Sequence, residues 1–169
     1  MSQLSFSSFD SLLHVRDERG HYLLASAEQV LEAAREVIDQ KFQRGASFTS
    51  PADAKEYLKA KLAGLDREVF AGLFLDNQHR LLAYRELFQG TIDEAQVYPR
   101  EVVKEALLLN ASAVILSHPH PSGSLEPSRA DEILTKRLKE ALAVVEVRVL
   151  DHIIVAGNAT TSMAERGLL

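Results

Sequence analysis

Apolar and polar residues follow two helical patterns in the first third of this chain. Residues 26–42 repeat apolar side chains every three or four positions, which places them on one face of a helix. Ser26 opens this stretch and is a favourable N-cap residue. Residues 50–64 begin with Ser50 and Pro51, which favour the start of a second helix. The pattern therefore predicts two helices before the chain changes character.

That change comes at residue 68, where apolar residues become nearly continuous. Residues 68–76 are apolar on both faces, as in a central strand that is buried on both sides. A turn and a partner strand over residues 80–88 complete a hairpin. Two further helices are expected over residues 98–110 and 128–145, and strands over residues 112–117 and 147–157. The expected order from residue 68 is ββαβαβ, an α/β fold in which helices pack on a mixed sheet.

The chain divides into two parts on this interpretation. Residues 1 to about 25 show no clean periodicity and are interpreted as a poorly ordered lead-in to the first helix. Gly45 follows that helix, and a boundary or hinge is expected near residues 45–50. We therefore predict an N-terminal helical extension over residues 1–49 and a sheet-containing domain over residues 50–169.

The amino-acid composition excludes several kinds of functional site but adds little to the predicted fold. The 169 residues contain no cysteine, which excludes disulfides, thiolate zinc sites and a cysteine nucleophile. The net charge of −5 is unfavourable for strong non-specific binding to nucleic acid, although it is compatible with a local basic face that contacts DNA. The first residues do not resemble a signal peptide, and no stretch reaches the roughly 20 apolar residues of a membrane span. We expect a cytoplasmic protein with no membrane partner.

Two histidines stand close together in the stretch SHPHPSG, residues 117–123. In an extended chain, side chains two positions apart point to the same side. Each histidine precedes a proline, which drives the residue before it into an extended conformation. His118 and His120 are therefore predicted to point the same way, where two imidazoles can hold one metal ion. The alternative is a proline-rich loop with two exposed histidines, and a His-x-His pattern alone does not decide between them.

Ser128 and Asp131 open the next predicted helix with the spacing of a capping box. Ser50 and Asp53 have the same spacing, so capping is the simplest interpretation of Asp131. A carboxylate in the first helical turn nevertheless has a defined position, and the loop before it is short enough to return to the histidines. Asp131 is therefore a candidate third ligand, which would leave one position open for water, as in catalytic zinc sites.

A hydrolytic site also needs a base that accepts a proton from water. Glu68 begins the predicted central strand, and Glu86 lies near the end of its partner strand. Either side chain could instead be exposed at a strand end, so the pattern alone leaves this choice open. His152, within a predicted strand, also has two interpretations: a hydrogen bond to the backbone, or a contact that orients a metal ligand.

Taken together, these motifs resemble a known family. The histidine pair, the Ser-x-x-Asp pair and a distant upstream glutamate resemble the JAMM metalloprotease signature, and the chain from about residue 50 to residue 169 resembles the RadC family. The segments that carry the likeness are LFLDNQHRLLAYRELFQGTIDEAQVYPREVVKEALLLNASAVILSHPHPSGSLEPSRADEILTKRL, RVLDHIIVAG and SMAERGLL. The resemblance implies a JAMM/MPN fold, a curved mixed sheet flanked by helices that is similar in architecture to cytidine deaminases.

The resemblance also implies roles for individual residues. It implies that His118, His120 and Asp131 bind one zinc ion (Zn²⁺) per chain. It implies that Glu68 is the general base and that Ser128 stabilises the oxyanion of a tetrahedral intermediate. The implied activity is hydrolysis of a peptide or isopeptide amide bond in a peptide or protein substrate. The rival hypothesis is a non-catalytic JAMM-like interaction module, associated with DNA repair, and a homodimer is compatible with both.

The sequence departs from the RadC pattern at two places. Pro119 stands where RadC proteins usually have asparagine, so a hydrogen-bonding side chain is replaced by a ring that stiffens the loop. Residues 1–49 show no helix-hairpin-helix pattern, which is the region of longer RadC proteins expected to contact DNA. We therefore expect a short form of the family, for which the case for DNA binding is weaker.

Overall fold

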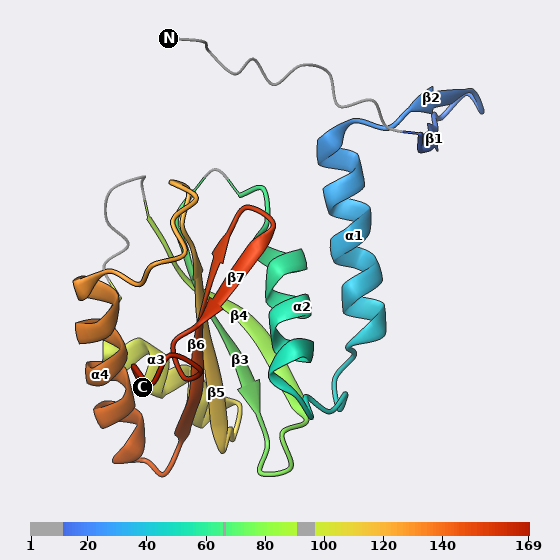
Figure 1. Cartoon of the computed structure of the whole chain (residues 1–169). Helices are drawn as coiled ribbons and strands as arrows, with labels where there is room; N and C mark the ends of the chain where they lie inside the picture. Colours follow the sequence, from blue (N-terminus) through green and yellow to red (C-terminus); the bar gives the residue numbers. More distant parts are fainter. Residues whose placement is uncertain (1–11, 66, 91–96) are drawn as a thin grey trace, which may run out of the picture.

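A five-stranded sheet lies at the centre of the computed structural model, which describes residues 12–65, 67–90 and 97–169 (Figure 1). The strands lie in the order β4-β3-β5-β6-β7. Their bounds are β3 (Val69–Leu75), β4 (Leu81–Gln89), β5 (Ala113–Pro119), β6 (Arg148–Ala156) and β7 (Ala159–Ser162). β5 and β6 pair in parallel, and the other neighbours pair antiparallel. The predicted α/β fold with a mixed sheet is confirmed.

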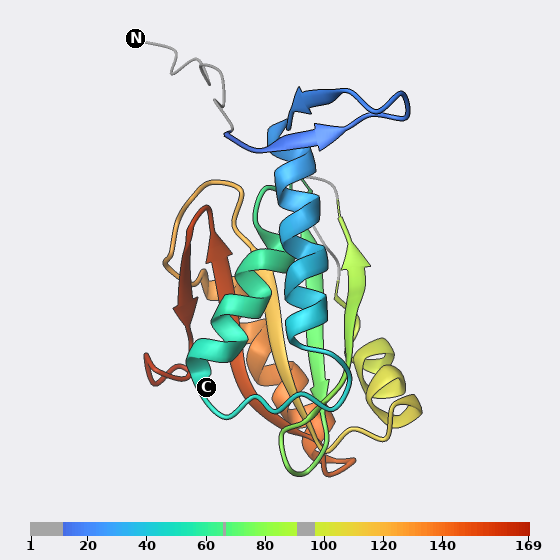
Figure 2. The same ribbon diagram turned by 90° about the vertical axis from the view of Figure 1, so that its right-hand side faces the viewer.

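Helices cover both faces of this sheet (Figures 1 and 2). α2 (Pro51–Leu62) packs on one face, and α1 (Ala27–Lys41) packs against α2. α3 (Pro99–Leu108) and α4 (Arg129–Ala143) lie together on the opposite face. None of the helices in the described parts of the chain is long and apolar enough to cross a membrane.

All four described helices begin where the sequence predicts: α3 starts at Pro99, and the other three start after a capping serine. Ser26, Ser50 and Ser128 are the N-caps of α1, α2 and α4, and each forms a complete capping box with the third residue of its helix. The box satisfies backbone N–H groups that would otherwise lack a partner at the start of a helix. The local sequence therefore determines where these helices start.

β3 is the central buried strand that its apolar pattern predicts, with all seven residues buried. Its odd-numbered side chains belong to the core on the α2 face, whereas Phe70 and Phe74 belong to the core on the α4 face. Side chains alternate between the two faces of a strand. The parity of a residue number in β3 therefore tells which face of the sheet the side chain occupies.

The N-terminal part differs from its prediction. Residues 14–24, interpreted from the sequence as part of a poorly ordered lead-in, form a hairpin of β1 (His14–Arg16) and β2 (Tyr22–Leu24). Asp17 closes the turn between them, since its carboxylate accepts hydrogen bonds from two backbone N–H groups of the turn. The strands are too short to produce a periodic pattern, which is why the prediction was wrong there. Residues 1–11 of the predicted lead-in lie outside the described residues.

The extension predicted over residues 1–49 thus contains a hairpin as well as a helix. Its end also joins the core on the α2 face. Phe42, directly after α1, stacks on Phe48 with ring centroids 5.0 Å apart, and Tyr57 of α2 packs edge-on against both rings. The hydroxyl of Tyr57 donates to Asp39 at 2.9 Å. α1 is therefore anchored to α2, and the domain boundary near residue 49 stays a prediction.

Candidate metal centre

β5 brings the two histidines to one end of the sheet. Its even-numbered residues face the α4 side, where Leu116 belongs to the core. The same alternation directs His118, in the strand, and His120, just beyond it, toward α4. Pro119 is accommodated in the extended backbone beside Val155 of β6, and the N–H of His120 donates to the Val155 carbonyl at 2.8 Å. The two imidazoles therefore lie side by side, with 2.9 Å between their Nε2 atoms.

α4 brings Asp131 to the same place. The hydroxyl of Ser128 accepts a hydrogen bond from the N–H of Asp131 at 3.1 Å, and Asp131 Oδ2 accepts one from the N–H of Ser128 at 2.7 Å. Asp131 Oδ1 lies 3.2 Å from His118 Nε2, and Oδ2 lies 3.4 Å from His120 Nε2. One side chain therefore caps the helix and also contacts both histidines.

The donor atoms of this group fit a metal ion. Those of His118, His120 and Asp131 lie within 4.8 Å of one another. His120 Nδ1 lies 2.8 Å from the backbone carbonyl oxygen of Ser124, which can only accept, so Nδ1 carries the hydrogen and Nε2 is left with a lone pair. Imidazole nitrogens and a carboxylate suit zinc, with Zn–N distances of about 2.0–2.1 Å, and imidazole also binds copper, iron and nickel.

The charge state of Asp131 adds to this fit. Burial by itself would raise the pKa of the carboxyl group. The hydrogen bond and charge of His118, together with the hydrogen bonds of Ser128, outweigh burial and hold the pKa of Asp131 well below its ordinary value. The carboxylate is therefore ionised and supplies negative charge where the two histidine rings converge.

Two buried residues lie directly behind the group. His152 of β6 is fully buried, and its Nε2 lies 2.8 Å from His118 Nδ1. Its Nδ1 lies 2.6 Å from the hydroxyl of Thr135. Of the two interpretations of His152, the structure thus shows the contact with a candidate ligand. Thr135 was missed, although its place one helical turn after Asp131 could have signalled it.

The two glutamates considered as a base lie on opposite faces of the sheet. Glu86 pairs with Ala71, which belongs to the core on the α2 face, so Glu86 faces away from the histidines. Glu68 is half-buried and directly precedes β3. It has the same parity as Phe70, whose ring stacks on the His118 ring with centroids 6.3 Å apart. Glu68 is therefore the candidate at the correct end and face of the sheet, and its role as a base stays a prediction.

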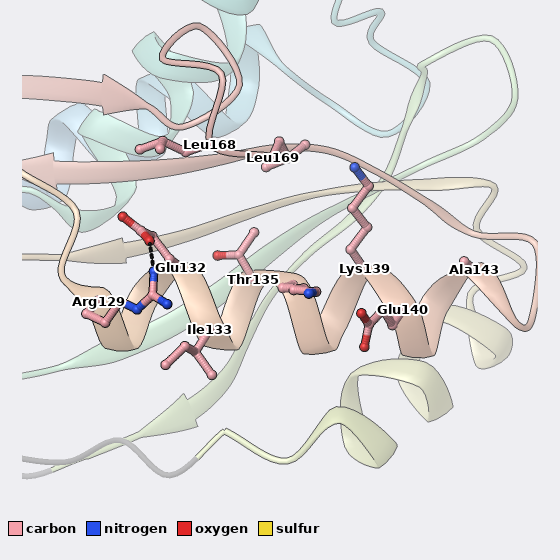
Figure 3. A pocket seen from close by; sticks show the side chains of 10 residues that line it. Arg129, Glu132, Ile133, Thr135, Lys139, Glu140, Ala143, Leu168 and Leu169 are labelled. Carbon is pink, nitrogen blue, oxygen red and sulfur yellow. Dashed lines mark hydrogen bonds and ion pairs between the residues drawn. The ribbon is translucent and has the colours of Figure 1, made fainter.

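A groove of about 650 Å³ runs along α4 (Figure 3). Side chains of α4 line it together with Leu168 and Leu169 at the end of the chain. Arg129 and Glu132, in the first helical turn, form an ion pair at 2.9 Å beside it. The groove thus begins next to the capping turn of α4, but its lining does not include His118, His120 or Asp131.

Comparisons with known proteins give a family match and several similar relatives. The family model described as a RadC-like JAB domain matches residues 48–168. A UPF0758 protein of Vibrio cholerae is 55% identical over 154 residues, which cover 89% of this chain and 97% of that protein.

A second relative, a UPF0758 protein of Methylibium petroleiphilum, is 59% identical over 145 residues, which cover 86% of this chain and 65% of that protein. This chain therefore spans about two thirds of the length of that longer relative. A third, from Thioalkalivibrio sulfidiphilus, is 51% identical over 166 residues, which cover 98% of this chain and 71% of that protein. The family match and these identities show that the chain belongs to the RadC-like JAB domain family.

Proposed function

We propose that this protein is a zinc-dependent hydrolase that cleaves a peptide or isopeptide amide bond. The observation that carries the proposal is the convergence of His118, His120 and Asp131, whose donor atoms lie within 4.8 Å of one another. Three protein ligands leave the fourth position of a tetrahedral ion open, which is the arrangement of catalytic rather than structural zinc. Membership of the RadC-like JAB domain family supports the same chemistry.

A zinc ion held by these residues would lower the pKa of water to about 7 and polarise the carbonyl group of the bond to be cleaved. Glu68 would accept the proton from water and pass it to the leaving amine. Its position supports this role, because it precedes β3 on the face of the sheet that carries the histidines. Its backbone carbonyl accepts a hydrogen bond from the N–H of Gly90 at 2.9 Å, which fixes the chain at the start of the strand.

Ser128 would stabilise the negative charge that develops on the carbonyl oxygen. Its hydroxyl donates to Asp131 Oδ2 at 2.7 Å. The backbone N–H of Ser128 donates to the same oxygen, also at 2.7 Å, so Asp131 stays anchored when the hydroxyl turns. Rotation of the hydroxyl hydrogen would then supply a donor to the substrate oxygen.

The test is turnover by zinc-loaded protein of a library of peptides and isopeptide-linked peptides, with the products identified by mass spectrometry. Glu68→Gln keeps the shape of the side chain but removes the base. It is expected to reduce turnover by roughly 10²–10⁴-fold without changing the zinc content. Glu86→Gln is the matched control, because Glu86 faces the opposite side of the sheet, and it should keep the wild-type rate.

The outcomes separate the hydrolase from the interaction module. Cleavage that is lost only in Glu68→Gln would support the hydrolase. Equal cleavage by Glu68→Gln, or no cleavage of any peptide by the zinc-loaded wild type, would contradict it. Peptide binding without cleavage, unchanged by Glu68→Gln, would favour the non-catalytic module.

A further inference from the structure

We propose that His152 is a positioning residue, which holds His118 in the ring orientation and tautomer that metal binding requires. The inference rests on the zinc site of the proposed function. It adds a chain of hydrogen bonds behind that site, from His118 through His152 and Thr135 to the backbone of Asp131.

The first link is the contact between the two histidine rings. β5 and β6 pair in parallel, with Leu116 beside His152, so His152 lies in the strand next to His118. The Nε2 atom of His152 is 2.8 Å from Nδ1 of His118. Phe70 packs edge-on against His152, with ring centroids 5.6 Å apart, and stacks on His118. His152 is fully buried, and in the described structure it is the hydrogen-bond partner of His118 Nδ1.

The second link fixes the direction of the hydrogen bonds. The Thr135 hydroxyl has one hydrogen, and it donates to the backbone carbonyl of Asp131 at 2.6 Å. The oxygen of Thr135 must then accept at its 2.6 Å contact with Nδ1 of His152. His152 is fully buried, and burial disfavours the charged form of an imidazole ring. The ring is therefore neutral, with its single hydrogen on Nδ1.

The hydrogen-bonding state of His152 determines the tautomer of His118, the candidate ligand. A neutral His152 that donates from Nδ1 can only accept at Nε2. His118 must then donate from its own Nδ1, so Nε2 is the nitrogen of His118 at which a metal ion can take the place of a proton. That nitrogen is the one that lies 2.9 Å from His120 Nε2 and 3.2 Å from Asp131 Oδ1. The buried chain of hydrogen bonds thus presents the correct nitrogen to the ion before the ion arrives.

The same chain connects two elements that supply ligands. Thr135 lies one turn after Asp131 on α4, and it bonds the backbone of that residue. His118 lies in β5. His152 therefore fastens the strand that carries one candidate ligand to the helix that carries another. When a ligand is held in this way by a buried partner, removal of the partner typically lowers the affinity of the site for its metal by 10–100-fold.

The experiment measures zinc affinity by competition with a chelator. His152→Leu has similar bulk but no hydrogen-bonding atom, and it should weaken zinc binding by roughly 10–100-fold. His152→Gln is the matched variant, since its amide oxygen can accept a hydrogen bond near the position of Nε2. It should recover most of the lost affinity. Long-range ¹H–¹⁵N spectra of the imidazoles should show His118 protonated on Nδ1 in the wild type and a mixture of tautomers in His152→Leu.

Two further variants separate positioning from general stability. Tyr57→Phe removes another hydrogen bond, the one that Tyr57 donates to Asp39 at 2.9 Å, and lies on the opposite face of the sheet from the candidate site. It should lower the melting temperature without changing zinc affinity. Thr135→Val is nearly isosteric and tests the proposal if His152→Leu does not fold. It should weaken zinc binding by roughly tenfold, because His152 loses the acceptor that fixes its tautomer.

Each outcome has a distinct meaning. Weaker binding in His152→Leu and Thr135→Val, with rescue in His152→Gln, would support the inference. Wild-type affinity and an unchanged His118 tautomer in His152→Leu or Thr135→Val would overturn it and leave the proposed function intact. Equal losses in His152→Leu and His152→Gln would overturn it as well, because bulk alone would explain the effect. A wild type that binds no zinc would overturn the proposed function itself, and this inference with it.

Discussion

Two helices of this protein begin with the same local arrangement and differ in what lies opposite it. α2 starts after Ser50, and α4 starts after Ser128. In each, the serine and an aspartate three residues later form a capping box. The serine hydroxyl lies 3.0 Å from Oδ2 of Asp53 in the first case and 2.7 Å from Oδ2 of Asp131 in the second. Locally, the two helix starts are nearly equivalent.

Their tertiary surroundings are not equivalent. Asp53 has one further side-chain partner in the described structure, the hydroxyl of Thr49 at 3.4 Å. Asp131 instead faces His118 and His120 at 3.2 and 3.4 Å. The comparison shows that a capping box is sufficient to start a helix. The presence of a capping box does not indicate that its aspartate binds a metal ion. The group that fits a metal exists only because β5 ends opposite α4.

The largest difference is expected when each carboxylate loses its charge. Asn can still accept a capping hydrogen bond, so Asp131→Asn and Asp53→Asn should both keep their helix starts. Asp131→Asn should abolish zinc binding in a chelator competition, because the neutral amide is a poor ligand for a cation. Asp53→Asn should bind zinc like the wild type. Equal zinc affinity in the two variants would show that Asp131 is only a cap.

The next difference is expected in turnover when each serine loses its hydroxyl. Ser128→Ala removes the donor proposed to act on the substrate oxygen, and the rate constant should fall by roughly 10²–10³-fold. Ser50→Ala removes the same group from α2, on the other face of the sheet, and should leave the rate unchanged. The measurement is kcat on any peptide that the wild type cleaves. A similar rate in both variants would argue against a role of Ser128 in catalysis.

A smaller effect is expected when zinc stabilises the fold. A ligand that binds only the folded state at 100 times its Kd adds about 2.7 kcal/mol to the free energy of unfolding. Zinc should have this effect on the wild type and on Asp53→Asn, but not on Asp131→Asn. Urea unfolding with and without zinc tests the difference. A gain in Asp131→Asn as large as in the wild type would locate the zinc elsewhere.

The smallest expected effect is the loss of stability when either capping serine is removed, and it should be similar for the two helices. In the absence of metal, Ser50→Ala and Ser128→Ala should each cost about 0.5–2 kcal/mol of stability, because each removes one helix cap. Urea unfolding of the metal-free variants tests this. A cost confined to one of them would show that the two capping boxes are not energetically equivalent.

The sequence predicted the parts of the fold that depend on local pattern. The capping serines located three helix starts, and the continuous apolar run that begins at Val69 predicted the buried strand β3. The hairpin over residues 14–24 was missed, because each of its strands has only three residues. Local pattern is informative only where an element is long enough to repeat it.

The candidate site depends on contacts that local pattern does not encode. The prolines after His118 and His120 predicted their common side. Asp131 and Asp53 cannot be separated by spacing, and Glu68 and Glu86 are separated only by strand parity within the folded sheet. The contact of His118 with a buried residue of β6 arises from parallel pairing across 34 residues of sequence. Such contacts had to come from the fold or from the family resemblance.

The central claim is that the three side chains form one metal site, and the metal content of the purified protein tests it most directly. Protein prepared without a histidine tag, and offered zinc, would be analysed by plasma mass spectrometry beside His118→Ala, Asp131→Ala and Asp53→Ala. We predict about one zinc ion per chain in the wild type and in Asp53→Ala, and close to none in the other two variants. No zinc in the wild type, or an equal amount in all four proteins, would contradict the account.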